Sequence, residues 1–115
     1  MVRKSADKTI EVKKMFGGAG EAKSFHILEG ADEMYGKGRL FNHVVLEPGG
    51  EIGWHIHQGD GETYYILKGR GEYNDNGQVL AVGPGDVTFV DAGEGHSLKN
   101  TGSENMEIIA LILFK

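Results

Sequence analysis

The sequence predicts an all-β domain, built as an antiparallel sandwich or barrel. About ten short segments rich in β-branched and aromatic residues are separated by turn residues at short intervals. No segment carries the apolar stripe of an amphipathic helix. Glycine contributes 19 of the 115 residues and proline only 2, a composition typical of many tight turns between short strands.

Each expected strand is a run of apolar and β-branched residues bounded by turn residues. The separator EGADEMYGKG, residues 29–38, could hold a helical turn. Asn76-Gly77 predicts a tight hairpin, because both residues tolerate positive φ. In chain order, the expected strands are residues 9–15, 24–28, 39–46, 53–57, 62–67, 71–74, 78–82, 86–90, 96–100 and 106–114.

Length and composition narrow the class of protein. A chain of 115 residues is expected to form one domain, 1–115, with residues 1–15 as a peripheral strand. The net charge is -5 without a basic stripe, so we expect no nucleic-acid partner. There is no cysteine, which excludes disulfides and thiolate metal sites. No secretory signal or bilayer-length apolar run is visible, so we expect a cytoplasmic protein without a membrane partner.

The stretch GWHIHQGDGE, residues 53–62, places two histidines on one face of a strand. If residues 58–61 form a hairpin loop, Glu62 lies opposite His57, and Tyr64 lies opposite His55. Two imidazoles and a carboxylate on one face could hold a divalent ion. An ordinary solvated strand face explains this stretch equally well. His96, in GDVTFVDAGEGHSLKN, is either a fourth ligand or a residue of a turn or of the core.

Together these residues resemble the two motifs of the cupin superfamily. Residues 49–69 fit the first motif, G-x5-HxH-x3,4-E-x6-G, at every spacing. Residues 85–100 fit the second, G-x5-P-x-G-x2-H-x3-N, except that Asp91 stands in place of the proline. We expect Asp91 to loosen or re-aim the turn before His96 without removing a ligand. The matching positions are Gly49, His55, His57, Glu62, Gly69, Gly85, Gly93, His96 and Asn100.

The resemblance implies a small single-domain microbial cupin. The fold would be a single antiparallel β-barrel, a double-stranded β-helix of the jelly-roll type. The family's metal ligands fall on His55, His57, Glu62 and His96. One divalent transition metal per chain is therefore expected, and the ligand set suits Mn, Fe, Ni, Co or Zn.

Two functions are compatible with such a site. The first is a metal-dependent oxidoreductase or lyase that acts on a small oxygenated molecule, as a dioxygenase, decarboxylase or isomerase. The second is a non-catalytic module that binds a metal and a small ligand, as a sensor or a store. No catalytic acid or base can be named. Tyr64 is the candidate for contacting the ligands, and Arg39 and Arg70 are candidates for holding an anionic substrate. Asp60 and Gln58 are expected to be solvated loop residues, and His43 to be structural.

The apolar run at residues 108–114 indicates whether the protein forms an oligomer. A half-buried antiparallel strand normally alternates apolar and polar residues, whereas this one is apolar on both faces. We therefore expect a homodimer that covers the outer face, with a contribution from Trp54 or Ile56. The alternative cover is the chain's own segment 9–15.

Overall fold

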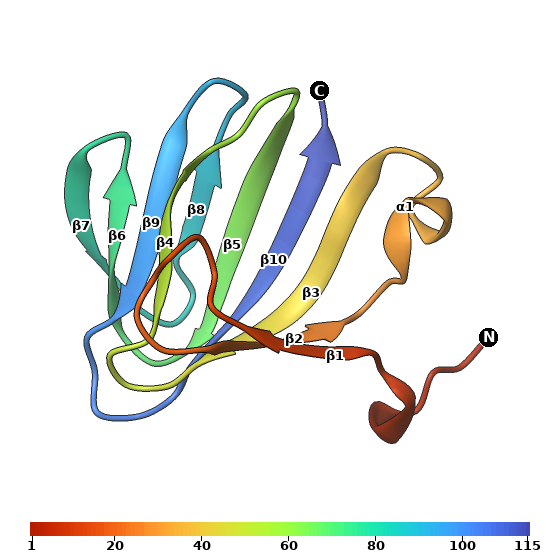
Figure 1. The fold of residues 1–115 in the computed structure, drawn as a ribbon, viewed down its shortest axis with the longest axis horizontal. Coiled ribbons are helices and arrows are strands. Elements are labelled where there is room, and N and C mark those ends of the chain that lie inside the picture. Colours follow the sequence, from red (N-terminus) through yellow and green to blue (C-terminus); the bar gives the residue numbers. More distant parts are fainter.

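The protein folds into two antiparallel β-sheets that face each other, as seen in a computed structural model that describes residues 1–115 (Figure 1). The chain forms a 3₁₀ helix, η1 (Ser5–Asp7), and a short helix, α1 (Gly30–Glu33). Neither helix has the length and apolar character needed to cross a membrane. The strands are β1 (Ile10–Lys13), β2 (Ala22–His26), β3 (Gly38–Leu46), β4 (Glu51–Ile56), β5 (Asp60–Lys68), β6 (Gly71–Asp75), β7 (Gln78–Val82), β8 (Val87–Val90), β9 (Gly95–Asn100) and β10 (Met106–Phe114).

The all-β prediction is confirmed, and each predicted strand overlaps one of the ten observed strands. Helix α1 is the helical turn expected in residues 29–38. The predicted hairpin joins β6 to β7, with φ of 53° at Asn76 and 101° at Gly77. The side chain of Asn74 supports this turn by accepting a hydrogen bond of 2.7 Å from the Gly77 amide.

One sheet has six strands in the order β1-β2-β3-β10-β5-β8, and the other has four in the order β4-β9-β6-β7. Each long strand alternates buried and less buried residues, so one face of each sheet turns inward. The core lies between these inner faces and contains fully buried side chains from both sheets. They include Leu46, Ile66, Leu98, Met106 and Ile108.

The predicted hairpin pairing across residues 58–61 is wrong. Strand β4 pairs with β9, whereas β5 pairs with β10 and β8, so the turn carries the chain from one sheet to the other. His57 is therefore not opposite Glu62, and Tyr64 is opposite Thr88 and Ala110 rather than His55. The physical reason is that β4 and β5 each have one face that must be buried. When the two strands lie in facing sheets, both of these faces pack into the same core.

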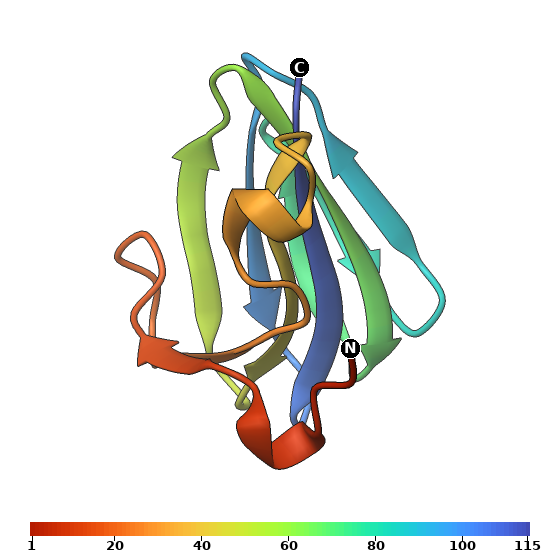
Figure 2. The ribbon, with the colours of Figure 1, turned by 90° about the vertical axis from the view of Figure 1, so that its right-hand side faces the viewer.

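The N-terminal segment does not lie across β10, so that alternative is wrong. Strand β1 instead pairs with β2 at the edge of the six-stranded sheet. The β1–β2 loop then reaches the other sheet and lies along β4 (Figures 1 and 2). There the Gly53 amide donates to the Met15 carbonyl (2.9 Å), and the Glu51 amide donates to the Ala19 carbonyl (2.8 Å). This loop ties the two sheets together.

The close contact between this loop and β4 requires a glycine in the loop. Substitution of that glycine tests the fold. A methyl group added at Gly18 would collide with the backbone carbonyl of Glu51. We expect Gly18→Ala to lower the free energy of unfolding by about 1–3 kcal/mol, measured by urea denaturation. Gly102→Ala is the control, because its nearest neighbours would be 3.5 Å away. Equal stability of the two variants would contradict close packing of the loop against β4.

Candidate metal centre

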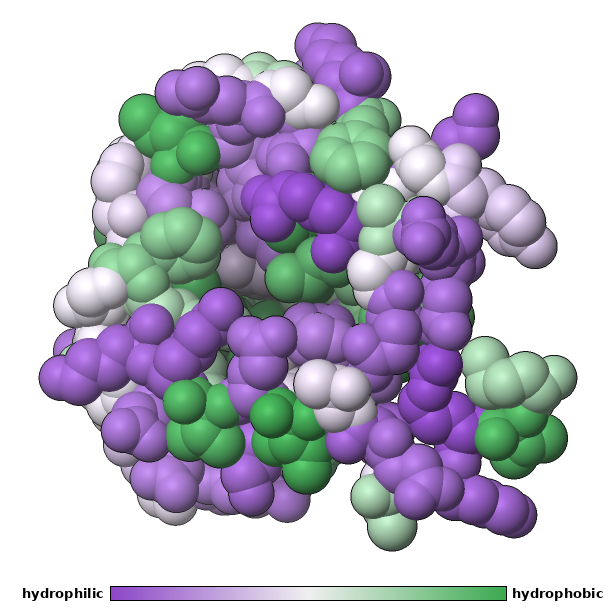
Figure 3. Space-filling model, turned by 45° about the vertical axis from the view of Figure 1, so that its right-hand side comes forward, coloured by the Kyte–Doolittle hydropathy of each residue, from purple (hydrophilic) through white to green (hydrophobic).

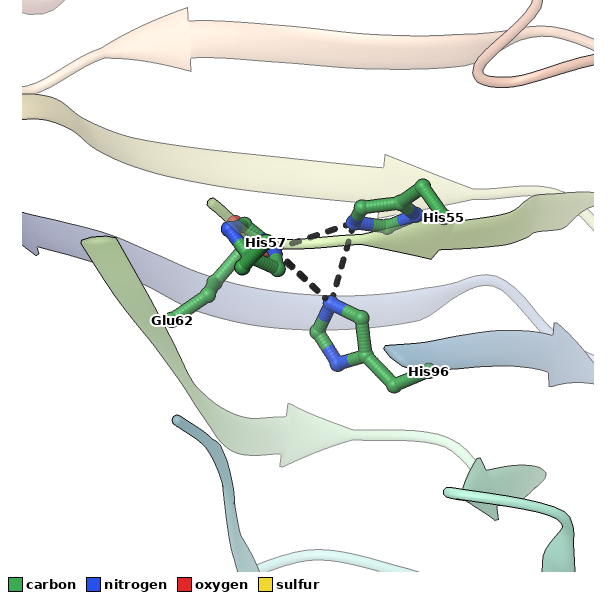
Figure 4. Close-up of side chains that lie close together, drawn as sticks. All are labelled: His55, His57, Glu62 and His96. Atoms are coloured by element: carbon green, nitrogen blue, oxygen red, sulfur yellow. Dashed lines mark hydrogen bonds and ion pairs between the residues drawn. The ribbon is translucent and has the colours of Figure 1, made fainter. Parts of the chain in front are cut away.

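Four side chains from three regions of the chain converge between the sheets (Figure 4). His55 comes from β4, His57 follows that strand, Glu62 comes from β5 and His96 comes from β9. One potential ligand atom from each residue lies within 4.8 Å of the others. The side chains are between 0% and 8% exposed, so the cluster is shielded from solvent. Such a cluster could hold one metal ion.

The backbone explains why these residues meet. His55 and His96 are direct partners in the pairing of β4 with β9. Beyond the end of β4, the His57 amide donates to the Glu94 carbonyl (3.0 Å), and the His57 carbonyl accepts from the Gly93 amide (2.7 Å). These bonds hold the segment after β4 against the turn before β9. Glu62 reaches the same point from the opposite sheet, because it is an inward-facing residue of β5.

The turn before His96 contains Asp91 and is held by its own hydrogen bonds. The Glu94 amide donates to the Asp91 carbonyl (3.1 Å), and the Asp91 amide donates to the Glu94 carboxylate (2.8 Å). The Asp91 side chain also accepts from the Ala92 amide (2.7 Å). These bonds close the turn, and His96 is delivered to the cluster with its Nε2 3.0 Å from that of His55.

Each imidazole is oriented by a contact at its Nδ1 atom. Such a contact fixes the ring and the tautomer of a metal-binding histidine. A carbonyl or carboxylate oxygen at Nδ1 requires that nitrogen to carry the hydrogen, which leaves a lone pair on Nε2. His55 Nδ1 contacts the Gly53 carbonyl (2.8 Å), and His57 Nδ1 contacts Asp60 Oδ1 (2.7 Å). His96 Nδ1 lies 2.6 Å from Tyr73 Oη, a hydroxyl that can donate or accept, so this contact orients the ring without fixing its tautomer.

The Nε2 atoms face one another around the Glu62 carboxylate. The Nε2 of His96 is 3.0 Å from that of His55 and 3.3 Å from that of His57. Glu62 Oε1 lies 3.1 Å from the Nε2 atoms of both His57 and His96. Three imidazole nitrogens and one carboxylate around a common point form a donor set that, once the nitrogens are deprotonated, fits a divalent ion such as Mn, Fe, Ni, Co or Zn.

The electrostatics of the cluster favour an ionised carboxylate. Burial would raise the pKa of Glu62, but hydrogen bonds with the three histidines outweigh burial and hold that pKa far below its ordinary value. The hydrogen bond with Glu62 raises the pKa of His57. Burial lowers the pKa of His96, which favours its neutral, metal-binding form.

Asp60 was expected to be a solvated loop residue, and this expectation is wrong. Asp60 is only 5% exposed and holds His57, while Gln58 is exposed as expected. Arg39 donates from Nε to Asp60 Oδ2 at 2.8 Å. Burial would raise the pKa of Asp60, but its bonds to Arg39 and His57 lower that pKa overall. Asp60 is thus a buried carboxylate that positions His57.

Aromatic side chains enclose the histidines. The Tyr64 ring stacks on His96 with centroids 4.9 Å apart, so Tyr64 does contact the cluster, although not through the predicted register. Phe16, from the β1–β2 loop, stacks on His55 with centroids 3.8 Å apart. Sequence reasoning missed Phe16 and Tyr73. Both belong to segments outside the two motifs. These segments reach the motif strands in space, β6 by pairing with β9 and the loop by folding back along β4.

A cavity of about 250 Å³ opens beside the cluster. The surface is hollowed on this side, where hydrophobic and hydrophilic side chains meet (Figure 3). Arg39 lines the cavity and Arg70 does not. His43 lies outside it, on the opposite face of β3, where it meets Glu107 at 2.8 Å. The apolar lining includes Leu40, Val44, Ile52, Ala110 and Ile112.

Residues 42–112 match the family model described as a cupin domain. An oxalate-binding protein from Thermotoga maritima is 43% identical over 114 residues, which cover 98% of this chain and 93% of that protein. The crystal structure of a predicted oxalate decarboxylase from Thermotoga maritima matches with a TM-score of 0.94 and 42% identity, covering 100% of both chains.

A more distant match shows the fold alone. The polyketide cyclase RemF from Streptomyces resistomycificus gives a TM-score of 0.75 at 19% identity, over 99% of this chain and 80% of that one. The family model covers well over half of the chain, and the Thermotoga relative is similar over nearly its whole length. These matches agree with the two facing sheets and the buried cluster. The chain therefore belongs to the cupin family.

Proposed function

We propose that the protein binds one divalent transition-metal ion through His55, His57, Glu62 and His96, and uses it to hold oxalate or a similar chelating acid. The observation that carries this proposal is the position of the buried cluster at the inner end of a cavity. The similarity to an oxalate-binding protein supports the choice of ligand. In this proposal, residues 1–115 form one domain whose two motifs, 49–69 and 85–100, supply the ligands.

The charges around the cavity suit an acid. A bound metal ion would supply Lewis acidity and a template for a chelating ligand. Lys13, Lys14 and Arg39 line the cavity and would offset the remaining negative charge of a dianion. The apolar floor would exclude water and strengthen these interactions.

Turnover of the bound acid by a metal-dependent lyase or oxidoreductase is a second candidate. It is favoured by Tyr64, which lines the cavity. Burial and the nearby Glu62 raise the pKa of this phenol well above its ordinary value, so its hydroxyl stays protonated and can donate to a ligand. Assays for formate, carbon dioxide and hydrogen peroxide with metal-loaded protein and oxalate separate the two functions. Product formation that is lost in Tyr64→Phe would support an enzyme, and binding without product would support a binding module.

The metal site is tested by substitution. His96→Ala should lower metal occupancy sharply and abolish oxalate binding, because it removes a ligand at the centre of the cluster. Elemental analysis after dialysis and calorimetry with oxalate measure the two effects. His43→Ala is the matched control, since this histidine lies on the outer face of β3. Stoichiometric metal in a His57→Ala, His96→Ala double variant would rule out the site.

Metal binding should weaken as the pH falls from about 8 to about 5, because protons compete for the imidazole nitrogens. Folding raises the pKa of His57 above 6.5. In the metal-free protein, protonated His57 therefore stabilises the folded state fully below pH 6.5. This stabilisation is lost as the pH rises through the raised pKa of His57. Metal-bound protein instead loses stabilisation on acidification. The gap between the thermal midpoints of the two forms should therefore shrink from pH 8 to 5. A constant gap would show that metal binding does not require neutral histidines.

We also propose a homodimer, and the outer face of the six-stranded sheet supports it. Strand β10 lies in the middle of this sheet, and its Ile109 and Leu111 point outward. Neighbouring outward residues are also apolar: Tyr65, Leu67, Val87, Phe89 and Leu113 are between 44% and 64% exposed. Trp54 and Ile56 are exposed on β4 of the other sheet, so they lie outside this face. The cytoplasmic location expected from the sequence stays a prediction.

Light scattering should give a mass of about twice 12.5 kDa for the wild-type chain. Tyr65→Arg should shift the mass towards the monomer, because it places a charge in the middle of the apolar face. Val79→Arg is the control, as Val79 is 59% exposed on β7 of the other sheet. A monomeric wild-type protein at micromolar concentration would reject the dimer.

A further inference from the structure

We propose that the ligand cavity includes an outer subsite for a second carboxylate. The favoured ligand would then be a chelating acid whose distal carboxylate lies several carbons away from the end that binds the metal. This inference rests on the proposed function, because it takes the metal cluster as the anchor for the chelating end.

A second cavity lies next to the first and shares lining residues with it. This outer cavity has a volume of about 330 Å³. Oxalate, whose two carboxylates are directly joined, would fill only the end next to the cluster. The wall shared by the inner and outer cavities is formed by Lys13, Met15, Arg39, Leu40 and Asn42.

Two buried polar side chains line these walls. Asn42 is 6% exposed and lines both cavities, so its carboxamide can donate to a ligand. Ser24 is 2% exposed, lines the outer cavity, and its Oγ has no partner. Buried polar groups are nearly always hydrogen-bonded, so each exception calls for a partner. A ligand that accepts hydrogen bonds from the amide and the hydroxyl would satisfy both.

The charged residues of the shared wall are cationic. Arg39 uses Nε to bind Asp60, which fixes its side chain while its terminal nitrogens remain for a ligand. Lys13 is paired only with Glu11, at 3.2 Å, and 59% of its side chain is exposed. Together with Asn42, these groups are hydrogen-bond donors, and a carboxylate accepts hydrogen bonds without donating any.

Acidic residues also line the outer cavity, but they are bound to a histidine. Glu11 Oε1 lies 2.9 Å from Nε2 of His26, and Glu29 Oε2 lies 3.2 Å from Nδ1 of the same ring. His26 pairs with Asn42 across β2 and β3, so this group forms the far wall beyond the donors. A distal carboxylate would therefore lie between the cluster and His26, against the cationic wall.

The sheet register gives the span of the ligand. Asn42 pairs with Ala110, which pairs in turn with Tyr64, so Asn42 lies two strands from the tyrosine that stacks on His96. Two strand spacings amount to about 10 Å between backbones. Side chains and metal coordination shorten the gap that a ligand must bridge. A five-carbon chain suits this span, and oxalate does not.

The test compares two acids with the same chelating end and the same chain length, 2-hydroxyglutarate and 2-hydroxypentanoate, by calorimetry with the metal-loaded protein. The wild-type protein should bind 2-hydroxyglutarate about tenfold or more tightly than 2-hydroxypentanoate, because only the former has a distal carboxylate. Asn42→Asp and Lys13→Ala should each bring this ratio towards one. Lys23→Ala should keep the wild-type ratio, because Lys23 is exposed on the outer face of β2.

The outcomes separate this subsite from the proposed function. Oxalate binding together with equal affinities for the two hydroxy acids would overturn the subsite and leave the proposed function standing. A ratio that survives in both Asn42→Asp and Lys13→Ala would also overturn it, since the distal carboxylate would then be bound elsewhere. If the metal-loaded wild-type protein binds neither oxalate nor either hydroxy acid, the proposed function itself is wrong.

Discussion

The burial of Glu62 is the constraint on which the rest of the structure depends. An ionised carboxylate that is 5% exposed would be strongly destabilising without compensating partners. The protein compensates with three imidazoles, and each must arrive with a defined orientation. This requirement explains why His55 and His96 are paired across two strands and why Asp60, Tyr73 and the Gly53 carbonyl hold the Nδ1 atoms. A divalent cation at the centre would neutralise this carboxylate and leave a positive charge for an acidic ligand.

The cluster also depends on how the two sheets are joined. The β1–β2 loop leaves one sheet and lies along β4 of the other, where Gly18 and Gly53 allow the backbones to approach closely. The same loop brings Phe16 onto His55 and places Lys14 and Met15 at the cavity. A segment that contributes no residue to the cluster therefore packs against His55 and lines the cavity beside it.

Local patterns and motif spacing predicted the strands and the four residues of the cluster well. Alternation and glycine-rich turns are local properties, so the ten strands and the Asn76-Gly77 hairpin could be read from the chain. The pairing of β4 with β5 was predicted wrongly, because a short turn can join strands within a sheet or between sheets. Asp60 looked like a loop residue, and Tyr73 lay outside both motifs. Their roles depend on the partners that they meet in space, Arg39 and His96, which are distant in the chain.

The central place of β10 has a consequence for the order of folding. This strand, Met106–Phe114, lies between β3 and β5 and supplies the neighbour that each of them needs on one side. A nascent chain that has emerged only as far as β9 would present two long strands with open edges, and such edges are prone to aggregation. Contacts between β3 and β10 join residues far apart in the chain, a topology that slows folding. Completion of the six-stranded sheet, and with it the wall of the cavity that Ala110 and Ile112 form, must therefore wait until residue 114 has been synthesised.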